Sequence, residues 1–285
     1  MTAHKGQAVG DSVAELVIRP NRGWVSLNVR EIWSYRELLY FFTWRDLKVR
    51  YKQTVFGAAW AVIQPFMMMV VFSLFLGRIS GIAPAGVPYP LFAFAGLVPW
   101  TLFSSGLNGS SASLVGAANL IQKVYFPRLL LPLSAIGSYL LDFAIAMVVL
   151  GLMMAYFGVV PSMAVVWLVP LTALALVSAL AMGIALSALN VRYRDVKYAV
   201  PFILQLWMFA SPVAYSADLV PEKWRTIYEL NPLTGVLEGF RWALLGQGGP
   251  PPLGPILVST GITAVVLLLG LAYFRRVERT FADII

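Results

Sequence analysis

Residues 129–191 read LLLPLSAIGSYLLDFAIAMVVLGLMMAYFGVVPSMAVVWLVPLTALALVSALAMGIALSALNV. Asp142 is the only Asp, Glu, Lys, Arg or His in these 63 residues. A helix needs about 20 mostly apolar residues to cross roughly 30 Å of hydrocarbon, so this stretch is long enough to cross a membrane twice. Glycine and proline within residues 158–161 interrupt the helical pattern and predict the turn between the crossings. We therefore expect two membrane spans here, at about residues 133–157 and 164–189.

The composition of the whole chain agrees with a membrane protein. Of its 285 residues, 59% are apolar and 12% are charged, whereas soluble globular domains carry about 25% charged residues. The net charge of +8 arises from 21 Lys and Arg against 13 Asp and Glu. These basic residues lie between the apolar stretches, as in a membrane protein, so nucleic acid is not an expected partner.

Other stretches without ionisable residues are long enough for one span each. Residues 79–122 form one such stretch, but its first part is rich in Gly and Pro and its last part, residues 108–113, is polar. We expect a single span there that ends at about residue 107. The chain is therefore predicted to be an all-α integral membrane protein with six transmembrane helices, at about residues 56–77, 91–107, 133–157, 164–189, 198–216 and 256–274.

The distribution of Lys and Arg predicts the orientation of the chain. Six spans put both termini on the same side of the membrane. If that side is the cytoplasm, 17 Lys and Arg lie in cytoplasmic segments and four in outer segments, as the positive-inside rule requires. No short apolar core with a small-residue cleavage site follows Met1, so no removable signal peptide is expected.

Aromatic and charged side chains are combined in residues 35–52, before the first span. The aromatic side chains recur at helical spacing, while the charged ones prevent the segment from crossing the membrane. We interpret residues 31–52 as an amphipathic helix on the cytoplasmic membrane surface; an ordinary juxtamembrane anchor is the alternative. Residues 1–30 show no strong periodicity and form an N-terminal arm, and residues 53–285 form the six-span domain.

The segment between the fifth and sixth spans is too apolar for a plain loop and too charged for another span. It predicts two short helices within about residues 221–246 that meet at Asn231 and Pro232. Glu238 and Arg241 are three residues apart, so they can pair on one helix face. A helix hairpin that re-enters the membrane needs protein or a water-filled cavity around it, which suggests the mouth of a pathway. The alternative is a surface hairpin that caps the bundle.

Two cytoplasmic loops, residues 119–134 and 191–198, are short and rich in basic and aromatic residues. Such loops can dock on a soluble partner, although they can also serve only as positive-inside anchors. Aromatic side chains within the spans can stack on the apolar face of a sugar, although most membrane aromatics only pack or anchor. The candidates on the first and fifth spans are Trp60, Gln64, Phe72, Trp207, Phe209 and Tyr215.

The residue inventory excludes most catalytic chemistry. The chain has no Cys, and its only His is His4, so disulfides, thiolate metal sites and His-based triads are excluded. No G-x-x-x-x-G-K-[ST] motif is present, so the chain does not hydrolyse nucleotide by that route. Asp142 is an intramembrane carboxylate and thus a candidate functional site; alternatively it is neutral, or hydrogen-bonded to Ser138 or Tyr139 on its own helix. An enzyme site on the outer face would have to use Asp218, Glu222, Glu229 and Glu238.

Several strings, taken in order, resemble one family. They are RDLKVRYKQTVFG (45–57) with Trp60 and QPF (64–66), KVYFPR (123–128), LNVRYRDVKY (189–198), SPVAYS (211–216) and NPLTGVLEGFR (231–241). Together with the six-span pattern they resemble the membrane permeases of polysaccharide-exporting ABC transporters, which include O-antigen, capsule and teichoic acid exporters.

This resemblance implies a homodimer with a channel at its interface and two separate ATPase subunits that bind ATP and Mg²⁺, whereas this chain binds no cofactor and no metal. Residues expected to couple to the ATPase are Arg45, Asp46, Arg50, Lys123, Arg128, Arg192, Arg194 and Asp195. The six candidates named above on the first and fifth spans would line the channel. The outer gate would contain Asn231, Pro232, Glu238 and Arg241.

The expected function is that of a non-enzymatic permease subunit in the bacterial inner membrane, with both termini cytoplasmic. It would move lipid-linked polysaccharide, such as O-antigen for lipopolysaccharide biosynthesis, out of the cytoplasm, in contact with membrane lipids. Two other classes stay open. One is a secondary transporter driven by an ion gradient through Asp142, and the other is a membrane enzyme that acts on lipid-linked sugars.

Overall fold

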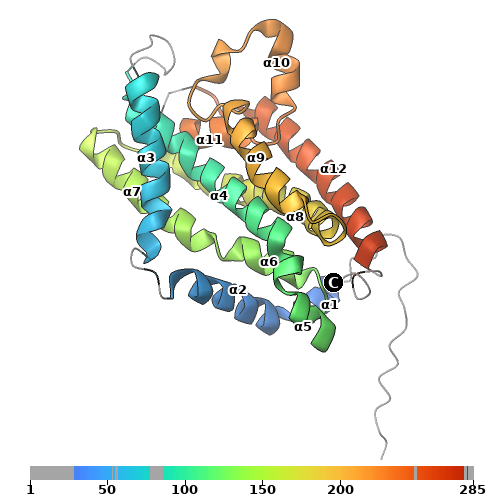
Figure 1. The fold of residues 1–285 in the computed structure, drawn as a ribbon. Helices are drawn as coiled ribbons and strands as arrows, with labels where there is room; N and C mark the ends of the chain where they lie inside the picture. Colours follow the sequence, from blue (N-terminus) through green and yellow to red (C-terminus); the bar gives the residue numbers. More distant parts are fainter. Residues whose placement is uncertain are drawn as a thin grey trace, which may run out of the picture.

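The computed structural model describes residues 29–52, 54, 57–77, 86–246, 249–278 and 281, and all regular structure in these residues is helical (Figure 1). The predicted N-terminal arm, residues 1–30, lies almost entirely outside this part of the chain. So do most of the residues between the first and second predicted spans. The described helices form one bundle with a single helix lying across one of its ends.

Four helical segments of the described chain are long and apolar enough to cross a membrane. They are α4 (Tyr89–Gly116), α6 (Leu130–Gly137) continued by α7 (Leu140–Tyr156), the 3-10 turn η2 (Met163–Trp167) continued by α8 (Leu168–Arg192), and α12 (Leu253–Glu278). The double crossing predicted from residues 129–191 is present, with its turn between Tyr156 and Met163. By length and composition, the described residues therefore contain four candidate membrane spans.

The first and fifth predicted spans are apolar helices that are shorter than predicted. After the 3-10 turn η1 (Gly57–Ala59), α3 covers Trp60–Phe75 with 16 residues, and α9 covers Val196–Phe209 with 14 residues. At 1.5 Å per residue these helices are about 24 and 21 Å long, less than the roughly 30 Å of a hydrocarbon core. The prediction of one helix over 198–216 is wrong at its end, because the chain leaves the helix after Phe209 and turns through Pro212.

Helix α4 is the central helix of the bundle. In its most apolar stretch 78% of the residues are buried, against 22% in each of the other three spans. The predicted end at residue 107 is wrong, because α4 continues through the polar residues to Gly116. The hydroxyls of Ser111 and Ser113 donate to carbonyl oxygens three residues earlier in the same helix, at 2.8 and 2.7 Å. Polar side chains whose hydrogen bonds stay within the helix do not end it.

Small residues let the spans approach one another closely. Gly183 of α8 lies against the side chain of Ser110 of α4, where a Cβ atom would overlap it, and a Cβ atom at Gly270 of α12 would lie 2.6 Å from the carbonyl oxygen of Ala181. The hydroxyls of Ser178 and Thr263 form a 2.7 Å hydrogen bond between α8 and α12. Close approach through small residues and hydrogen bonds between helices is typical of packing inside a membrane.

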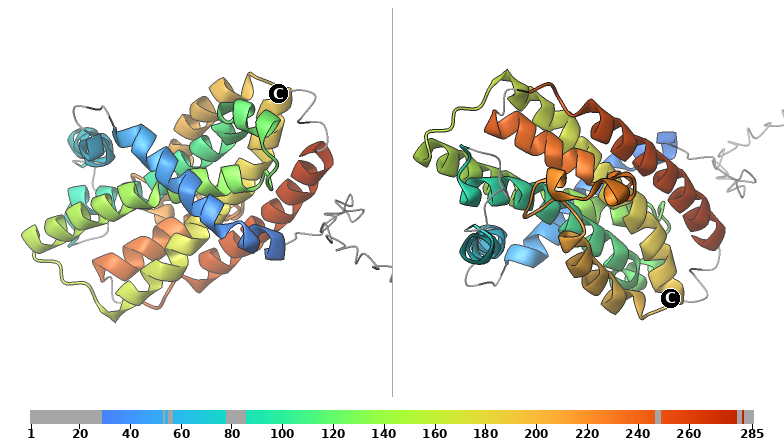
Figure 2. Two further views of the ribbon diagram at one scale, coloured as in Figure 1. Left: turned by 90° about the horizontal axis from the view of Figure 1, so that it is seen from below. Right: turned by 90° about the horizontal axis from the view of Figure 1, so that it is seen from above.

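Helix α2 (Arg36–Tyr51), preceded by α1 (Val29–Ser34), crosses the ends of the bundle helices on the side where α5 (Ala118–Lys123) also lies (Figure 2). Its Phe42 side chain is buried and meets the ring of Phe126 edge to face at 5.4 Å. Other large side chains of α1 and α2 stay exposed, namely Trp33, Tyr40, Phe41, Trp44 and Val49. The helix predicted over residues 31–52 is therefore present, packed on the bundle by one side and open on the other.

At the opposite end of the bundle lie the 3-10 turn η3 (Ala217–Leu219), α10 (Glu222–Glu229) and α11 (Thr234–Leu245) (Figure 1). Residues Asn231 and Pro232 lie between the two helices, as the sequence predicted. Helix α10 is largely exposed, whereas most of α11 is buried against α4, α8 and α12.

Candidate transport face

One side of the buried helix α4 is open. Thr101, Ser104, Asn108, Ala112 and Val115 are spaced so that they share one side of the helix, and all five are exposed or half-buried. We call this side the open face of α4. Sequence reasoning missed it, because the span was predicted to end at about residue 107, before the polar residues 108–113. The helical spacing of Thr101, Ser104 and Asn108 is the signal that would have found it.

Helix α3 lies beside α4 (Figure 1), and its Ala61 lines one cavity together with Thr101 of the open face. Trp60 is 54% exposed and Gln64, one turn later, is also exposed. Phe72 differs from these two, because its ring is only 6% exposed and packs edge-on against the ring of Phe209 at 6.3 Å. Of the three residues of α3 that were expected to line a channel, two lie on the surface and Phe72 lies in a packed contact.

Helix α9 borders the other side. Trp207 is half-buried and meets the ring of Phe103 of α4 edge to face at 5.4 Å. Phe209, at the end of α9, is 59% exposed. The hydroxyl of Tyr215 donates to the carbonyl oxygen of Phe209 at 2.8 Å and accepts a hydrogen bond from Tyr228 of α10 at 3.2 Å. Hydrogen bonds through Tyr215 and Tyr228 therefore link the end of α9 to α10.

Asp142 is held by a residue that is distant in the sequence. The Arg50 guanidinium donates to Asp142 Oδ2 at 2.8 Å and to the Ser138 hydroxyl at 2.8 Å, and it lies 3.7 Å above the centre of the Tyr139 ring. The alternative that Ser138 or Tyr139 binds the carboxylate directly is wrong. The guanidinium of Arg50 binds the carboxylate instead, and it also contacts Ser138 and Tyr139. This arrangement joins α2 to the start of α7.

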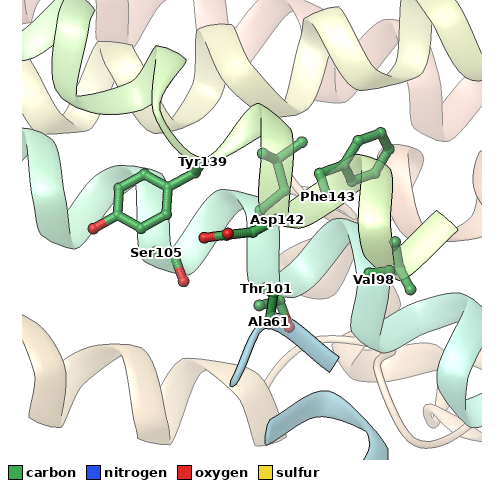
Figure 3. A pocket seen from close by; sticks show the side chains of 9 residues that line it. Ala61, Val98, Thr101, Ser105, Tyr139, Asp142 and Phe143 are labelled. Carbon is green, nitrogen blue, oxygen red and sulfur yellow. The ribbon is translucent and has the colours of Figure 1, made fainter. Parts of the chain in front are cut away.

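The other carboxylate oxygen, Asp142 Oδ1, is buried and has no hydrogen-bond partner in the described structure. The Asp142 side chain lines a small cavity of about 10 Å³ at the junction of α3, α4 and α7, together with Thr101 and Ser105 (Figure 3). The cavity is of the size of a single water molecule, and its three oxygen groups are enough to bind one. Asp142 thus lies beside the open face of α4.

The side chain of Arg241 fixes the outer hairpin. It is 5% exposed, and it donates to the carbonyl oxygens of Pro212 at 2.6 Å and Tyr215 at 3.2 Å, and to that of Val213. Its guanidinium also lies 3.7 Å above the ring centre of Phe92 in α4. The predicted pairing with Glu238 is wrong, since the salt bridges of the described residues do not include it and backbone carbonyls surround the guanidinium instead.

Asn231 and Glu238 complete the outer group. The Asn231 amide donates to the Ser211 hydroxyl at 2.8 Å and accepts from the backbone N–H of Leu233 at 3.1 Å, so it holds the turn between α10 and α11. Pro232 beside it is buried. Burial raises the pKa of the Glu238 carboxyl to about 7, and the nearby carboxylate of Asp218 adds to this shift.

The predicted ATPase-coupling residues gather at the end of the bundle where α2 lies. The Asn190 amide donates to the carbonyl oxygen of Ser111 at 3.1 Å, so the end of α8 lies beside the end of α4. Arg192, Arg194 and Asp195, which follow Asn190, are exposed. Lys123 and Arg128 line a cavity of about 220 Å³, and Arg128 also donates to the carbonyl oxygen of Glu278.

Comparison with known proteins identifies the class. Residues 37–245 match the ABC-2 type transporter family, and the chain belongs to this family. Within the described residues, no three His, Cys, Asp or Glu side chains lie close enough together to hold a metal ion.

The chain is also similar to individual proteins of this class. The chain is 31% identical over 261 residues to an O-antigen export system permease protein of Myxococcus xanthus, a match that covers 90% of this chain and 98% of the relative. It is 30% identical over 251 residues to a protein of the same description from Klebsiella pneumoniae, covering 87% and 95%. It is 22% identical over 252 residues to a polysialic acid transport protein of Escherichia coli, covering 82% and 91%. The resemblance to permeases of polysaccharide exporters is thereby confirmed.

Proposed function

We propose that this chain is the channel-forming subunit of an ATP-driven exporter that moves a lipid-linked polysaccharide from the cytoplasm across the bacterial inner membrane. The observation that carries the proposal is the open face of α4. Helix α4 is otherwise the most buried span, and yet Ser104 and Asn108 remain accessible on it. Polar groups at membrane depth are tolerated where they face protein or a water-filled pathway rather than lipid.

A second copy of the chain would close this face into a channel. Helices α3 and α9 flank the face and leave it uncovered within one chain, and both are apolar enough to stand in a membrane. With these two short helices, each copy has six spans, so both of its termini lie on the same side of the membrane. The positive-inside count assigns that side to the cytoplasm. A homodimer is therefore the assembly that we propose.

The energy for transport would come from two copies of a separate ATPase subunit that binds ATP and Mg²⁺. Membership of the ABC-2 family and the absence of a nucleotide-binding motif in this sequence support this. The exposed side chains of Arg192, Arg194 and Asp195, and the loop that contains Lys123 and Arg128, would contact that subunit. The three charged residues Arg45, Asp46 and Arg50 lie at the same end of the bundle.

The polymer would advance along weak stacking contacts. Trp60, Phe209 and the half-buried Trp207 and Tyr215 flank the open face, and rings of this kind stack on the apolar face of a sugar while its hydroxyls stay wet. Shallow, repeated contacts suit a cargo that must keep moving. At the outer end, α10 and α11 would form the gate, held in place by Asn231 and Arg241 and carrying Pro232 and Glu238.

Reconstitution into vesicles tests the proposal. The purified chain is inserted with and without its ATPase partner, and transfer of the polymer across the membrane is followed with ATP present or absent. Transfer should require both the partner and ATP. Transfer by the chain alone would contradict the proposal, and loss of transfer in Asp142→Asn, together with dependence on an ion gradient, would favour the secondary carrier instead.

A further inference from the structure

A second cavity lies at the cytoplasmic end of the open face, between α2, α4 and α6. Its volume is about 240 Å³. Arg45, Asp46 and Arg50 of α2 form one wall. The residues of α4 that line it are small, Gly109, Ala112, Ser113 and Gly116. Ala112 belongs also to the open face, so the cavity and the face are continuous.

The charges of this cavity are balanced. Arg45 donates to Asp46 Oδ1 through Nε at 3.0 Å and through Nη2 at 2.8 Å, and Arg50 is paired with Asp142 at 2.8 Å. Each guanidinium therefore already has a carboxylate. An anionic ligand such as a phosphate gains from unpaired positive charge, and this cavity does not provide it. A neutral ligand with many hydroxyl groups fits its charge better.

Several polar atoms of the cavity residues keep free hydrogen-bonding capacity. None of the hydrogen bonds of the described residues uses Arg45 Nη1, Arg50 Nε, Asp46 Oδ2 or the Tyr139 hydroxyl. These atoms comprise two donors, one acceptor and one group that does both. Neighbouring hydroxyls of a sugar donate to a carboxylate and accept from a guanidinium at the same time, so they match this set.

The size and floor of the cavity agree with one sugar ring. A volume of about 240 Å³ is many times the roughly 10–15 Å³ that a single water molecule requires. The α4 wall presents small side chains and backbone, on which the apolar face of a pyranose can pack. A Cβ atom at Gly109 would lie 2.6 Å from the Tyr139 ring. Glycine at this position therefore lets the tyrosine close the inner side of the cavity.

We propose that this cavity is a saccharide subsite, which holds one neutral sugar residue of the exported glycan at the cytoplasmic start of the open face. The inference rests on the proposed function and names the part of the substrate that is recognised first. Asp46 would accept hydrogen bonds from the sugar, Arg45 and Arg50 would donate to it, and the small residues of α4 would contact its apolar face.

Two variants test the subsite in the full complex with the ATPase. Gly116→Leu fills the cavity, and a Cβ atom at Gly116 meets no other atom within 4 Å, so the fold should tolerate it. Asp46→Asn removes the acceptor charge and leaves the cavity with a net positive charge. Gly261→Leu on α12 is the matched control, because a Cβ atom there also meets nothing within 4 Å and lies far from the cavity in sequence and on another helix.

Binding is measured by saturation-transfer NMR with a panel of neutral methyl glycosides, and with inorganic pyrophosphate as the anionic probe. At least one glycoside should bind to the unmodified complex, with affinity reduced fivefold or more in Gly116→Leu and Asp46→Asn and unchanged in Gly261→Leu. Failure of every glycoside to bind, or equal binding in all variants, would overturn the proposal. Pyrophosphate binding that strengthens in Asp46→Asn, without glycoside binding, would identify an anion site instead.

Export measurements separate this inference from the function on which it rests. If the unmodified complex exports polymer with ATP, and Gly116→Leu exports it equally well, the subsite is refuted while the exporter stands. If the unmodified complex exports nothing, the proposed function fails first. Co-purification of the ATPase subunit with Gly116→Leu and Gly261→Leu, neither of which changes a residue expected to contact it, reports whether the complex has assembled.

Discussion

The guanidinium of Arg50 and the carboxylate of Asp142 lie 2.8 Å apart, although 92 residues separate them in the sequence. Their side chains are 29% and 20% exposed, so the pair is largely shielded from water. Arg50 belongs to the helix that lies across the bundle, and Asp142 to the first turn of α7, near the middle of the span Leu130–Tyr156. The pair therefore fixes the crossing helix to the span and gives the intramembrane carboxylate a structural role.

Breaking this pair should loosen α2. Because removal of one partner leaves the other charge poorly solvated, Arg50→Gln should lower the free energy of unfolding by about 1–2 kcal/mol. A double-mutant cycle with Asp142→Asn, followed by thermal unfolding in detergent, measures the coupling. Lys48→Gln, on the exposed side of α2, is the control and should have little effect. Additive effects of the Arg50 and Asp142 substitutions would show that the pair is not coupled.

Substitution of Trp60 and Trp207 distinguishes a role in stacking on the polymer from a role in packing the fold. Trp60→Ala and Trp207→Ala should each lower polymer export several-fold, because each removes a ring beside the open face. Trp207 also packs on Phe103, so its loss should cost about 1–2 kcal/mol of stability as well. Export in vesicles and thermal unfolding are measured for both variants, with Trp60→Phe as the conservative control. Unchanged export in both alanine variants would remove the stacking contacts from the mechanism.

The buried guanidinium of Arg241 should be essential for seating the outer hairpin. Arg241→Met leaves the carbonyl oxygens of Pro212 and Val213 without a donor, at a cost of about 3 kcal/mol or more. Gly96→Ala should act similarly, because its Cβ atom would lie 2.5 Å from Arg241 Nη2 and 2.6 Å from the Val213 carbonyl oxygen. Hydrogen exchange of residues 212–246 should rise in both variants. Gly151→Ala, where a Cβ atom meets nothing within 4 Å, should leave exchange unchanged.

Glu238 should make the stability of the outer hairpin depend on pH. Burial raises the pKa of its carboxyl from 4.5 to about 7, with Asp218 and Glu229 adding to the shift and Arg241 and Arg225 opposing it. Since the folded chain binds the proton more tightly than the unfolded chain, this group favours folding fully below about pH 4.5, and the contribution is lost as the pH rises through about 7.

Substitution of this carboxyl isolates its effect. Glu238→Gln should therefore be more stable than the unmodified chain at pH 8, by on the order of 2 kcal/mol, and about equally stable at pH 4.5. Thermal unfolding in detergent across this range is the measurement, with Glu222→Gln on the exposed side of α10 as control. A constant difference between Glu238→Gln and the unmodified chain at every pH would refute the shift.

Charge reversal at the exposed end of α8 tests the coupling loop. Arg192→Glu combined with Arg194→Glu should uncouple ATP hydrolysis from export, or release the ATPase, because acidic side chains replace basic ones on a surface that the partner would contact. Co-purification with the ATPase and export are compared with the unmodified complex. Normal assembly and coupled export would exclude this loop as the contact.

Hydropathy was sufficient for the elements whose signal is local. The double crossing of residues 129–191 follows from two long apolar runs with Gly and Pro between them, and the helices of residues 130–156 and 168–192 match it within a few residues. The short helices on either side of Asn231 were also predicted from the sequence, because the segment is too apolar for a plain loop and too charged for another span. The family resemblance is local as well, because it depends on short strings of consecutive residues.

Helix α4 shows where hydropathy misleads. Its polar residues after position 107 predicted the end of the span, but the hydroxyls of Ser111 and Ser113 bond to carbonyls of their own helix and Ser110 packs against Gly183. A hydropathy count does not show whether a hydroxyl is satisfied by its own backbone, nor which helix covers it. The open face of α4 is therefore defined only by the positions of the neighbouring helices in the structure.

The sequence by itself determined that this chain is a helical membrane protein, because transfer of apolar side chains out of water is additive along the chain and independent of distant residues. Its likeness to polysaccharide-export permeases was also present in the sequence, but in the short strings that resemble that family and not in the hydropathy. The tertiary structure alone decided that Arg50 holds Asp142, that Arg241 donates to the carbonyls of Pro212, Val213 and Tyr215, and that Phe72 is packed rather than open. Each of these depends on two or more segments meeting in space, where short-range hydrogen bonds and burial act between groups that the sequence separates by dozens of residues.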